Sequence, residues 1–140
     1  MHALKLQNQY YISSNPDDID LGAVCRLLWN VHWAAGRPKH IIEKSIQNSR
    51  CFGVFKGYEQ IGFARVVTDY ATYAYISDVV ICGHYRGQSL GHWLIKHILT
   101  HHEFIHVDQW RLKTTYAHTF YKKFGFKPLK HPDKFLEILK

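Results

Sequence analysis

A segment with small side chains, HYRGQSLGHWLI at positions 84–95, lies between an apolar run and a helix-like pattern. The first turn of a helix carries backbone N–H groups without intrahelical partners, and its peptide dipoles place about half a positive charge there. Gly87 and Gly91 have no side chain that would keep a ligand from these amides, while Arg86 and Ser89 can add donors. The segment therefore predicts a pyrophosphate-binding loop. A turn that only joins a strand to a helix stays the alternative.

Two better-known phosphate-binding patterns do not occur in this sequence. It contains neither G-x-x-x-x-G-K-[ST] nor G-x-G-x-x-G followed by an acidic residue about twenty positions later. A nucleoside-triphosphate or dinucleotide site is therefore disfavoured.

Histidines are the candidate metal ligands. His97 and His101 are four residues apart on a predicted helix, and His102 follows them. No cysteine or carboxylate completes a metal-binding set, so we expect solvated helix histidines and no metal. Cys25 and Cys51 lie in apolar surroundings, as does Cys82, and none belongs to a convincing Cys-His pair.

The composition limits the class of protein. With 140 residues, 46% of them hydrophobic and 15% aromatic, the chain is expected to form one globular domain over residues 1–140. The net charge of +7 favours an anionic ligand, which leaves nucleic acid, acidic lipid or a phosphorylated small molecule open. The basic residues are scattered without a run of five or six, so nucleic-acid binding is disfavoured.

The compartment follows from the cysteines and from the hydropathy. Three cysteines, odd in number and far apart, indicate reduced thiols in a cytoplasmic protein. The start MHALKLQNQYY lacks an apolar signal region, and no run of eighteen apolar residues occurs. We therefore expect a protein that is neither exported nor membrane-spanning.

The elements that position the loop follow from hydrophobic periodicity. The pattern predicts the order β-α-α-β-β-β-α-β-α-β, with a hairpin turn around Gly57 and a helix end at Gly125. The strand, helix, strand passage through the loop calls for a parallel crossover, so the fold class is α/β with a mixed sheet and helices on its faces. The predicted elements are residues 10–12, 19–31, 38–46, 51–55, 61–67, 72–81, 90–100, 106–114, 117–124 and 134–139.

Four segments together resemble the GNAT superfamily of acyl-CoA-dependent N-acyltransferases. VVICGHYRGQSLGHWLIKHIL resembles its acyl-CoA-binding motif, and AHTFYKKFGFKPL its penultimate helix and following strand. WAAGRP at 33–38 and IGFARVVTD at 61–69 resemble a small subgroup of it. The predicted element order matches the family fold, a mostly antiparallel mixed sheet, over nearly the whole chain.

The resemblance implies acetyl-CoA as co-substrate and assigns residues to it. The strand at Val79, Val80 and Ile81 would splay from its neighbour and pair with the pantetheine arm; simple sheet core is the alternative. Two positions depart from the family pattern, since Ser89 stands where glycine is usual and Thr114 where asparagine is common. The residues assigned to the pyrophosphate are Arg86, Gly87, Gln88, Ser89, Leu90, Gly91 and His92.

The resemblance also suggests the catalytic residues. Tyr121 falls where the family has a tyrosine that protonates the departing thiolate, and a phenol with a pKa of about 10 still holds its proton near pH 7. A plain aromatic residue in a helix face is the alternative. Asp78 is the best candidate for the base that deprotonates the amine, with Glu43, Asp69 and His118 as weaker ones. A strand carboxylate satisfied by backbone, Tyr75 or Arg65 is equally open.

The sequence thus predicts an N-acetyltransferase in which a primary amine attacks acetyl-CoA directly, without a covalent enzyme intermediate. Trp33, Arg37 and Arg65 are the candidates for acceptor binding. A CoA-binding sensor or interaction module without turnover is the alternative. The expected partner is a small-molecule or peptide amine, with neither nucleic acid nor membrane, and the expected state is a monomer or homodimer.

Overall fold

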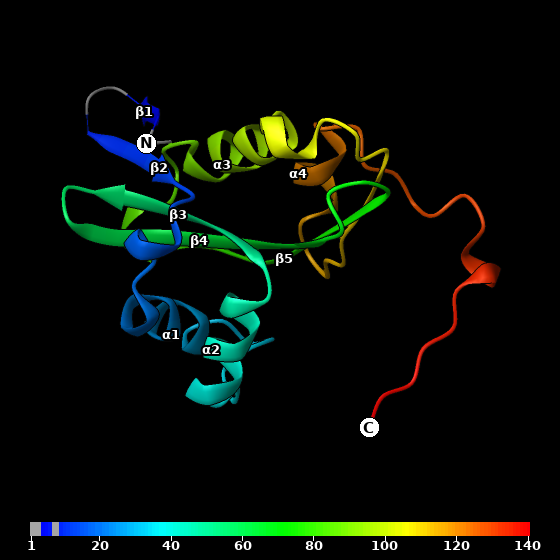
Figure 1. Cartoon of the computed structure of the whole chain (residues 1–140), viewed down its shortest axis with the longest axis horizontal. Coiled ribbons are helices and arrows are strands. Elements are labelled where there is room, and N and C mark those ends of the chain that lie inside the picture. Colours follow the sequence, from blue (N-terminus) through cyan, green and yellow to red (C-terminus); the bar gives the residue numbers. More distant parts are fainter. Residues whose placement is uncertain (1–3, 7–8) are drawn as a thin grey trace.

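A six-stranded mixed sheet forms the centre of the molecule in the computed structural model, which describes residues 4–6 and 9–140 (Figure 1). Neighbouring strands are antiparallel from the first to the fifth, and the fifth and sixth are parallel. The strands, in both chain and sheet order, are β1 (Leu4–Leu6), β2 (Tyr10–Ser13), β3 (Arg50–Lys56), β4 (Glu59–Thr68), β5 (Tyr73–Ile81) and β6 (Gln109–Arg111).

Helices cover both faces of this sheet. α1 (Leu21–Trp29) and α2 (Lys39–Gln47) lie on one side, and α3 (Leu90–Leu99) and α4 (His118–Lys122) on the other (Figure 1). Asp20 begins α1 because its side chain accepts a hydrogen bond from the Ala23 amide, and Pro38 precedes α2. None of the helices in the described part of the chain is long and apolar enough to cross a membrane.

Two apolar cores result, one on each face of the sheet. Phe52 packs with Leu94 and Ile95 of α3, and Phe63 packs with Val24 and Leu28 of α1. All six side chains are at most 1% exposed. The buried faces fix α3 and α1 on opposite sides of β3, β4 and β5, which leaves the end of β5 between the two helix layers.

A bulge interrupts β5 at Asp78. Phe63 pairs with Val80 and Arg65 with Ser77, so Asp78 and the residue after it stand opposite a single residue of β4. Asp78 takes a left-handed conformation with φ 56°, which few residues other than glycine adopt. The extra residue shifts the alternation of side chains in the last residues of β5, so it changes which of them point toward each of the two cores.

β5 and β6 run together for only three residues. The parallel pairing joins Tyr73–Tyr75 to residues 109–111 and then ends. Within the described chain, residues 76–81 of β5 therefore have a strand partner on the β4 side alone. Beyond this pairing the two strands share no further ladder pairs.

The structure confirms most of the predicted elements and corrects two. The hairpin at Gly57, the three antiparallel strands and the parallel crossover through α3 are present. The strand predicted at residues 134–139 is wrong, since that segment is extended but pairs with no strand. The strand at Leu4–Leu6 was not predicted. Apolar alternation shows that a segment can pair, but not whether a sheet edge lies within its reach.

Candidate active site

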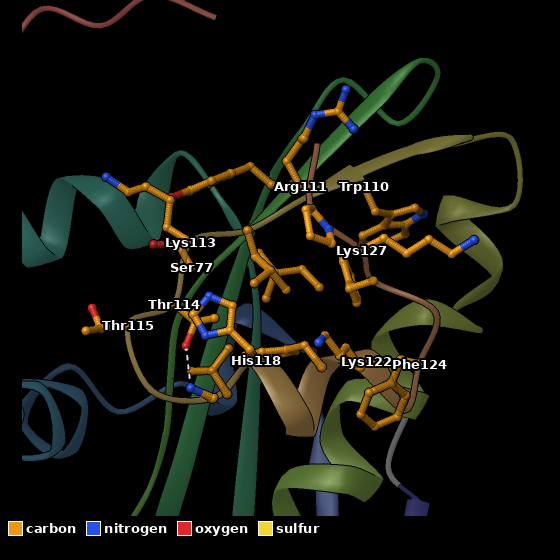
Figure 2. Close-up of a pocket in the computed structure, with 18 of the residues that line it drawn as sticks. Ser77, Trp110, Arg111, Lys113, Thr114, Thr115, His118, Lys122, Phe124 and Lys127 are labelled. Carbon is orange, nitrogen blue, oxygen red and sulfur yellow. Dashed lines mark hydrogen bonds between the residues drawn. The ribbon is translucent and has the colours of Figure 1, made fainter. Parts of the chain in front are cut away.

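A cavity of about 1580 Å³ opens where β5 and β6 diverge. It is bordered by β5, β6, α4, the segment after α1 and residues 125–130, and Figure 2 shows side chains from several of these elements around one space. It brings together eight of the sequence-predicted site residues, including the weaker base candidate His118: Trp33, Arg37, Arg65, Asp78, Val79, Thr114, His118 and Tyr121. Val80, Ile81 and residues 86–92 do not line it.

Asp78 joins two arginines from different elements. Its Oδ2 accepts hydrogen bonds from Arg37 Nη1 at 2.8 Å and from Arg65 Nε at 2.6 Å, and its side chain is only 1% exposed. Of the alternatives left open by the sequence, pairing with Arg65 is therefore observed, and Arg37 is a second partner. The Arg37 carbonyl accepts from the Trp29 indole, which ties this segment back to α1.

Tyr121, on α4, also lines the cavity. Its ring makes edge contacts with Phe120 and Phe126, with ring centroids 4.9 and 5.9 Å apart. Burial raises the pKa of Tyr121 above its ordinary value, because the charged phenolate is poorly solvated there. The hydroxyl therefore holds its proton at neutral pH, which the predicted acid requires.

Thr114 has a local structural task. Its hydroxyl oxygen accepts a hydrogen bond from the Ala117 amide at 3.0 Å, in the turn that leads into α4. Thr114 therefore helps to set the start of the short helix that carries Tyr121, while it also lines the cavity.

The predicted phosphate loop leads from a short 3-10 turn, residues 83–85, into α3. Gly87 has φ +81° and Ser89 has φ +62°, so both adopt the left-handed region. The Ser89 side chain does not cap the helix, and the first helical bond runs from the Trp93 amide to the Ser89 carbonyl. The amides of residues 90–92 at the first turn thus point outward without intrahelical acceptors.

Two side chains hold this loop against the sheet. The side-chain Oε1 of Gln88 accepts from the Tyr10 hydroxyl at 2.8 Å, and Arg86 Nε donates to the Ile81 backbone carbonyl at 3.3 Å. The Arg86 amide itself donates to the Gly83 carbonyl at 3.4 Å. Arg86 and Gln88 therefore shape the loop, and the loop joins the open end of β5.

The expectation of solvated histidines is wrong for His97 and His101, whereas His102 is exposed. His101 is 7% exposed, and the rings of His97 and His101 both pack edge-on against Phe52. Burial lowers the pKa of His101 to about 4 and also lowers that of His97. Among the described residues no group of three or more histidine, cysteine, aspartate or glutamate side chains is arranged to hold a metal ion.

The buried thiols of Cys25 and Cys51 are poor nucleophiles. Burial raises the pKa of Cys51 to about 12 and raises that of Cys25. A thiol with a raised pKa is rarely a thiolate at neutral pH, which is the form that attacks. All three cysteines are free, and none of them lines the cavity.

Sequence reasoning missed the positive lining of the cavity. Five basic residues beyond Arg37 and Arg65 contribute to it, against the carboxylates of Asp78 and Asp108. Three of them follow β6 or α4, and the two lysines after Gly125 were the available sequence signal. These five residues are Arg111, Lys113, Lys122, Lys127 and Lys130.

Comparison with known proteins agrees with this geometry. The sequence model of the GNAT acetyltransferase domain matches residues 47–128, more than half of the chain. A GNAT-family protein of Xanthomonas campestris has the same fold, with a TM-score of 0.89 and 31% identity over 94% of this chain and 93% of that one. The chain belongs to the GNAT family of acetyltransferases.

Two further proteins are similar at lower identity. A Gibberella zeae protein that carries an acetyltransferase name is 26% identical over 110 residues, which is 64% of this chain and 62% of that relative's length. Glucosamine-6-phosphate N-acetyltransferase of Arabidopsis thaliana shares the fold alone, with a TM-score of 0.66 and 12% identity over 94% of this chain and 97% of that one.

Proposed function

We propose that this protein transfers an acetyl group from acetyl-CoA to a primary amine within the cavity between β5 and β6. The observation that carries the proposal is the divergence of these two strands, which leaves one edge of β5 open directly beside the cavity that Tyr121 lines. An open strand edge can pair with an amide-containing arm, as in strand addition by peptides. The pantetheine arm of CoA is such a chain.

The loop before α3 is the proposed pyrophosphate site. It adjoins the end of β5, so a cofactor with its arm along Val79, Val80 and Ile81 has its phosphates near the amides of residues 87–92. Gly87, Gln88 and Ser89 form the turn, and Leu90, Gly91 and His92 form the first turn of the helix. The outward amides and the helix dipole supply the attraction for an anion.

The proposed chemistry is one displacement at the thioester. The amine nitrogen attacks the carbonyl carbon, an amide of β5 near Val80 polarises the oxygen, the carbon–sulfur bond breaks, and Tyr121 gives its proton to the thiolate. Removal of a proton from an amine of pKa about 10.4 costs about 4 to 5 kcal/mol at pH 7, so a base must assist. The base role of Asp78 stays a prediction. Its two ion pairs support a second task, holding Arg37 and Arg65 at the acceptor side.

The charge of the cavity favours a particular kind of amine. Seven arginine and lysine side chains line it against two carboxylates, and Arg37 and Arg65 already share Asp78. A polycation would enter this surface against repulsion. We therefore propose an acceptor that carries a carboxylate or phosphate besides its amine, with the aromatic face of Trp33 as part of its pocket.

A CoA-binding module without turnover is the second candidate. Ser89 and Thr114, the two departures from the family pattern, are the residues that favour it. The two candidates differ in whether the thioester is consumed, because both require binding of CoA. Location in a reducing cytoplasm stays a prediction, consistent with three free cysteines.

The test is a thiol-release assay with acetyl-CoA and two matched sets of amines, one anionic (amino acids, phosphorylated amino sugars) and one polycationic (polyamines, aminoglycosides). We expect turnover with the anionic set. Tyr121→Phe should lower kcat by about 100-fold or more, because a positioned general acid contributes at least this much. Calorimetric titration with CoA should give the same affinity for Tyr121→Phe and the unaltered protein.

Tyr58→Phe is the matched control, since this tyrosine is fully exposed in the β3–β4 turn. CoA binding without thiol release from any amine would favour the binding module. Unchanged kcat in Tyr121→Phe would remove Tyr121 from the chemistry, and absence of CoA binding would refute both candidates.

A further inference from the structure

Three aromatic side chains from two distant segments meet in the wall of the cavity. His32 and Trp33 belong to the turn after α1, Tyr116 precedes α4, and all three line the cavity. The His32 ring stands edge-on to Trp33 with ring centroids 5.3 Å apart, and its centroid is 5.9 Å from that of Tyr116. We call these three residues the aromatic rim. The rim brings the segment after α1 into contact with the turn before α4.

The rings of the rim are exposed although the backbone beneath them is held. Trp33 is 50% exposed and Tyr116 84%. The turn that carries Trp33 is fixed at two points, since Ala34 is only 2% exposed and the Trp29 indole donates to the Arg37 carbonyl at 2.8 Å. Trp33 therefore offers an indole face to the cavity at a defined position. Such a face binds an aromatic ring by offset stacking.

The two arginines of the acceptor side keep an excess of positive charge. Arg37 and Arg65 share the single carboxylate of Asp78, so two positive charges stand against one negative charge. A guanidinium has five N–H groups, so each arginine retains donors for a second anion. One carboxylate balances this cluster, whereas a phosphate with two negative charges exceeds it. The other five basic residues of the cavity lie on β6, on α4 and in the segments that follow them, beside the proposed CoA site, whose phosphates they can neutralise.

The distance from the arginines to the reacting carbonyl limits the acceptor further. Asp78 precedes Val80 by two residues of β5, and the amide near Val80 is the one proposed to polarise the thioester. Two residues of a strand span about 7 Å. An α-amino acid carries its amine and its carboxylate on one carbon, which fits this short separation. In a phosphorylated amino sugar several bonds separate the two groups.

We propose that the acceptor is a free aromatic α-amino acid, an inference that rests on the proposed acetyl transfer. Its carboxylate binds between Arg37 and Arg65, and its amine faces the thioester. Its ring stacks on Trp33 and is bordered by Tyr116. His32 is a positioning residue, because its contacts with Trp33 and Tyr116 hold these two rings in place.

The proposed transfer leaves the carboxylate and the ring of the acceptor unchanged. The α-nitrogen forms a bond to the acetyl carbon while the carbon–sulfur bond breaks. The ammonium group of the amino acid loses two protons overall. One balances the proton that Tyr121 gives to the thiolate, and the other passes to solvent. The products are the N-acetyl amino acid and CoA with its thiol restored.

Four amines separate the contribution of the ring from that of the carboxylate. L-phenylalanine has both groups, phenethylamine has only the ring, L-alanine only the carboxylate, and ethylamine neither. We expect the highest kcat/KM for L-phenylalanine in the thiol-release assay, at least about 10-fold above each of the other three, because burial of a phenyl ring or pairing of a carboxylate contributes this much.

Trp33→Ala tests the aromatic rim directly. It should lower kcat/KM for L-phenylalanine by about 10-fold or more and leave that for L-alanine within about twofold, because only the ring contact is lost. Tyr58→Ala is the matched control, an aromatic residue that is fully exposed in the β3–β4 turn, and should change neither value. Circular dichroism should show that both variants are folded.

Two variants of His32 test its positioning role. His32→Phe keeps a ring between Trp33 and Tyr116 and should retain the preference for L-phenylalanine over L-alanine. His32→Ala should reduce this preference without lowering kcat/KM for L-alanine. A preference that is equal in both variants would remove His32 from the rim.

The outcomes distinguish this inference from the proposed acetyl transfer. Equal kcat/KM for L-phenylalanine and L-alanine would overturn the ring contact, and equal kcat/KM for L-phenylalanine and phenethylamine would overturn the carboxylate contact, while acetyl transfer would stand. If no amine releases thiol, acetyl transfer fails, and calorimetric titration of L-phenylalanine into the protein in millimolar CoA decides the inference. Binding that is lost in Trp33→Ala would support the aromatic amino acid site, and absence of binding would overturn it.

Discussion

Asp78 shows how one residue combines several constraints. It is buried, it has a positive φ at a bulge, and its Oδ2 meets two guanidinium groups. The sequence identified it as a carboxylate in a central strand and left its partners open. Arg37 is 41 positions away, and only the tertiary fold brings it to this carboxylate. Sequence pattern predicts which residue types are present, but not which distant side chains meet.

Asp78→Asn should therefore destabilise the fold and weaken acceptor binding together. Removal of the carboxylate leaves Arg37 and Arg65, which are mostly buried, without their anion, and we expect the free energy of unfolding to fall by about 2 to 4 kcal/mol. Urea denaturation measures this loss. KM for the amine should rise more than KM for acetyl-CoA.

Asp17→Asn is the control for this change, because Asp17 is exposed and remote from the cavity. An Asp78→Asn protein as stable as the unaltered one would show that the two ion pairs of Asp78 contribute nothing to the free energy of unfolding. A loss of kcat alone, with both KM values kept, would instead favour Asp78 as the base.

Elements with strong periodicity were predictable. The helix over residues 90–100 and the antiparallel strands around Gly57 follow from local pattern and turn chemistry, and the structure confirms them. β6 is shorter than predicted, because only residues 109–111 pair before the strands diverge. The strand predicted at residues 134–139 is absent from the sheet. Hydrophobic periodicity does not show which sheet edge a segment can reach.

The backbone conformation of Ser89, in the loop before α3, affects the stability of the protein. Ser89 adopts a left-handed conformation that costs a non-glycine residue about 1 kcal/mol or more, so Ser89→Gly should raise the free energy of unfolding by up to about 1 kcal/mol. The backbone amides keep their positions, so CoA affinity should be equal or higher. Thermal denaturation and calorimetry check the two parts.

Ser89→Ala is the matched variant, since it removes the hydroxyl and keeps the strained backbone. If Ser89→Ala weakens CoA binding and Ser89→Gly does so equally, the hydroxyl is a ligand for the phosphate. Equal stability of all three proteins would contradict the strain argument.

The stability of the whole molecule should depend on pH through its buried histidines. The pKa of His101 is lowered to about 4 by burial, and that of His97 is lowered for the same reason. Glu103, with Oε1 3.8 Å from His101 Nδ1, opposes the effect, and Arg50 adds to it. Between pH 6.5 and about 4 the unfolded chain binds protons that the folded chain does not, so stability decreases as pH falls through this window.

We expect His101 to account for up to about 3 kcal/mol of that decrease. His101→Asn keeps an acceptor near the Glu103 amide without a titrating ring and should flatten the profile of unfolding free energy against pH. The exposed His40→Asn should leave the profile as it is. Parallel profiles for His101→Asn and the unaltered protein would show that His101 titrates normally.

The bulge in β5 has a consequence for how this chain can change in length. The extra residue reverses the alternation of side chains between the two faces of the sheet. Val79 therefore contacts the α3 core and Val80 the α1 core. Loss or gain of one residue there would exchange these inward directions and place each side chain in the wrong layer. Insertions and deletions near Asp78 are therefore compatible with both cores only in steps of two residues.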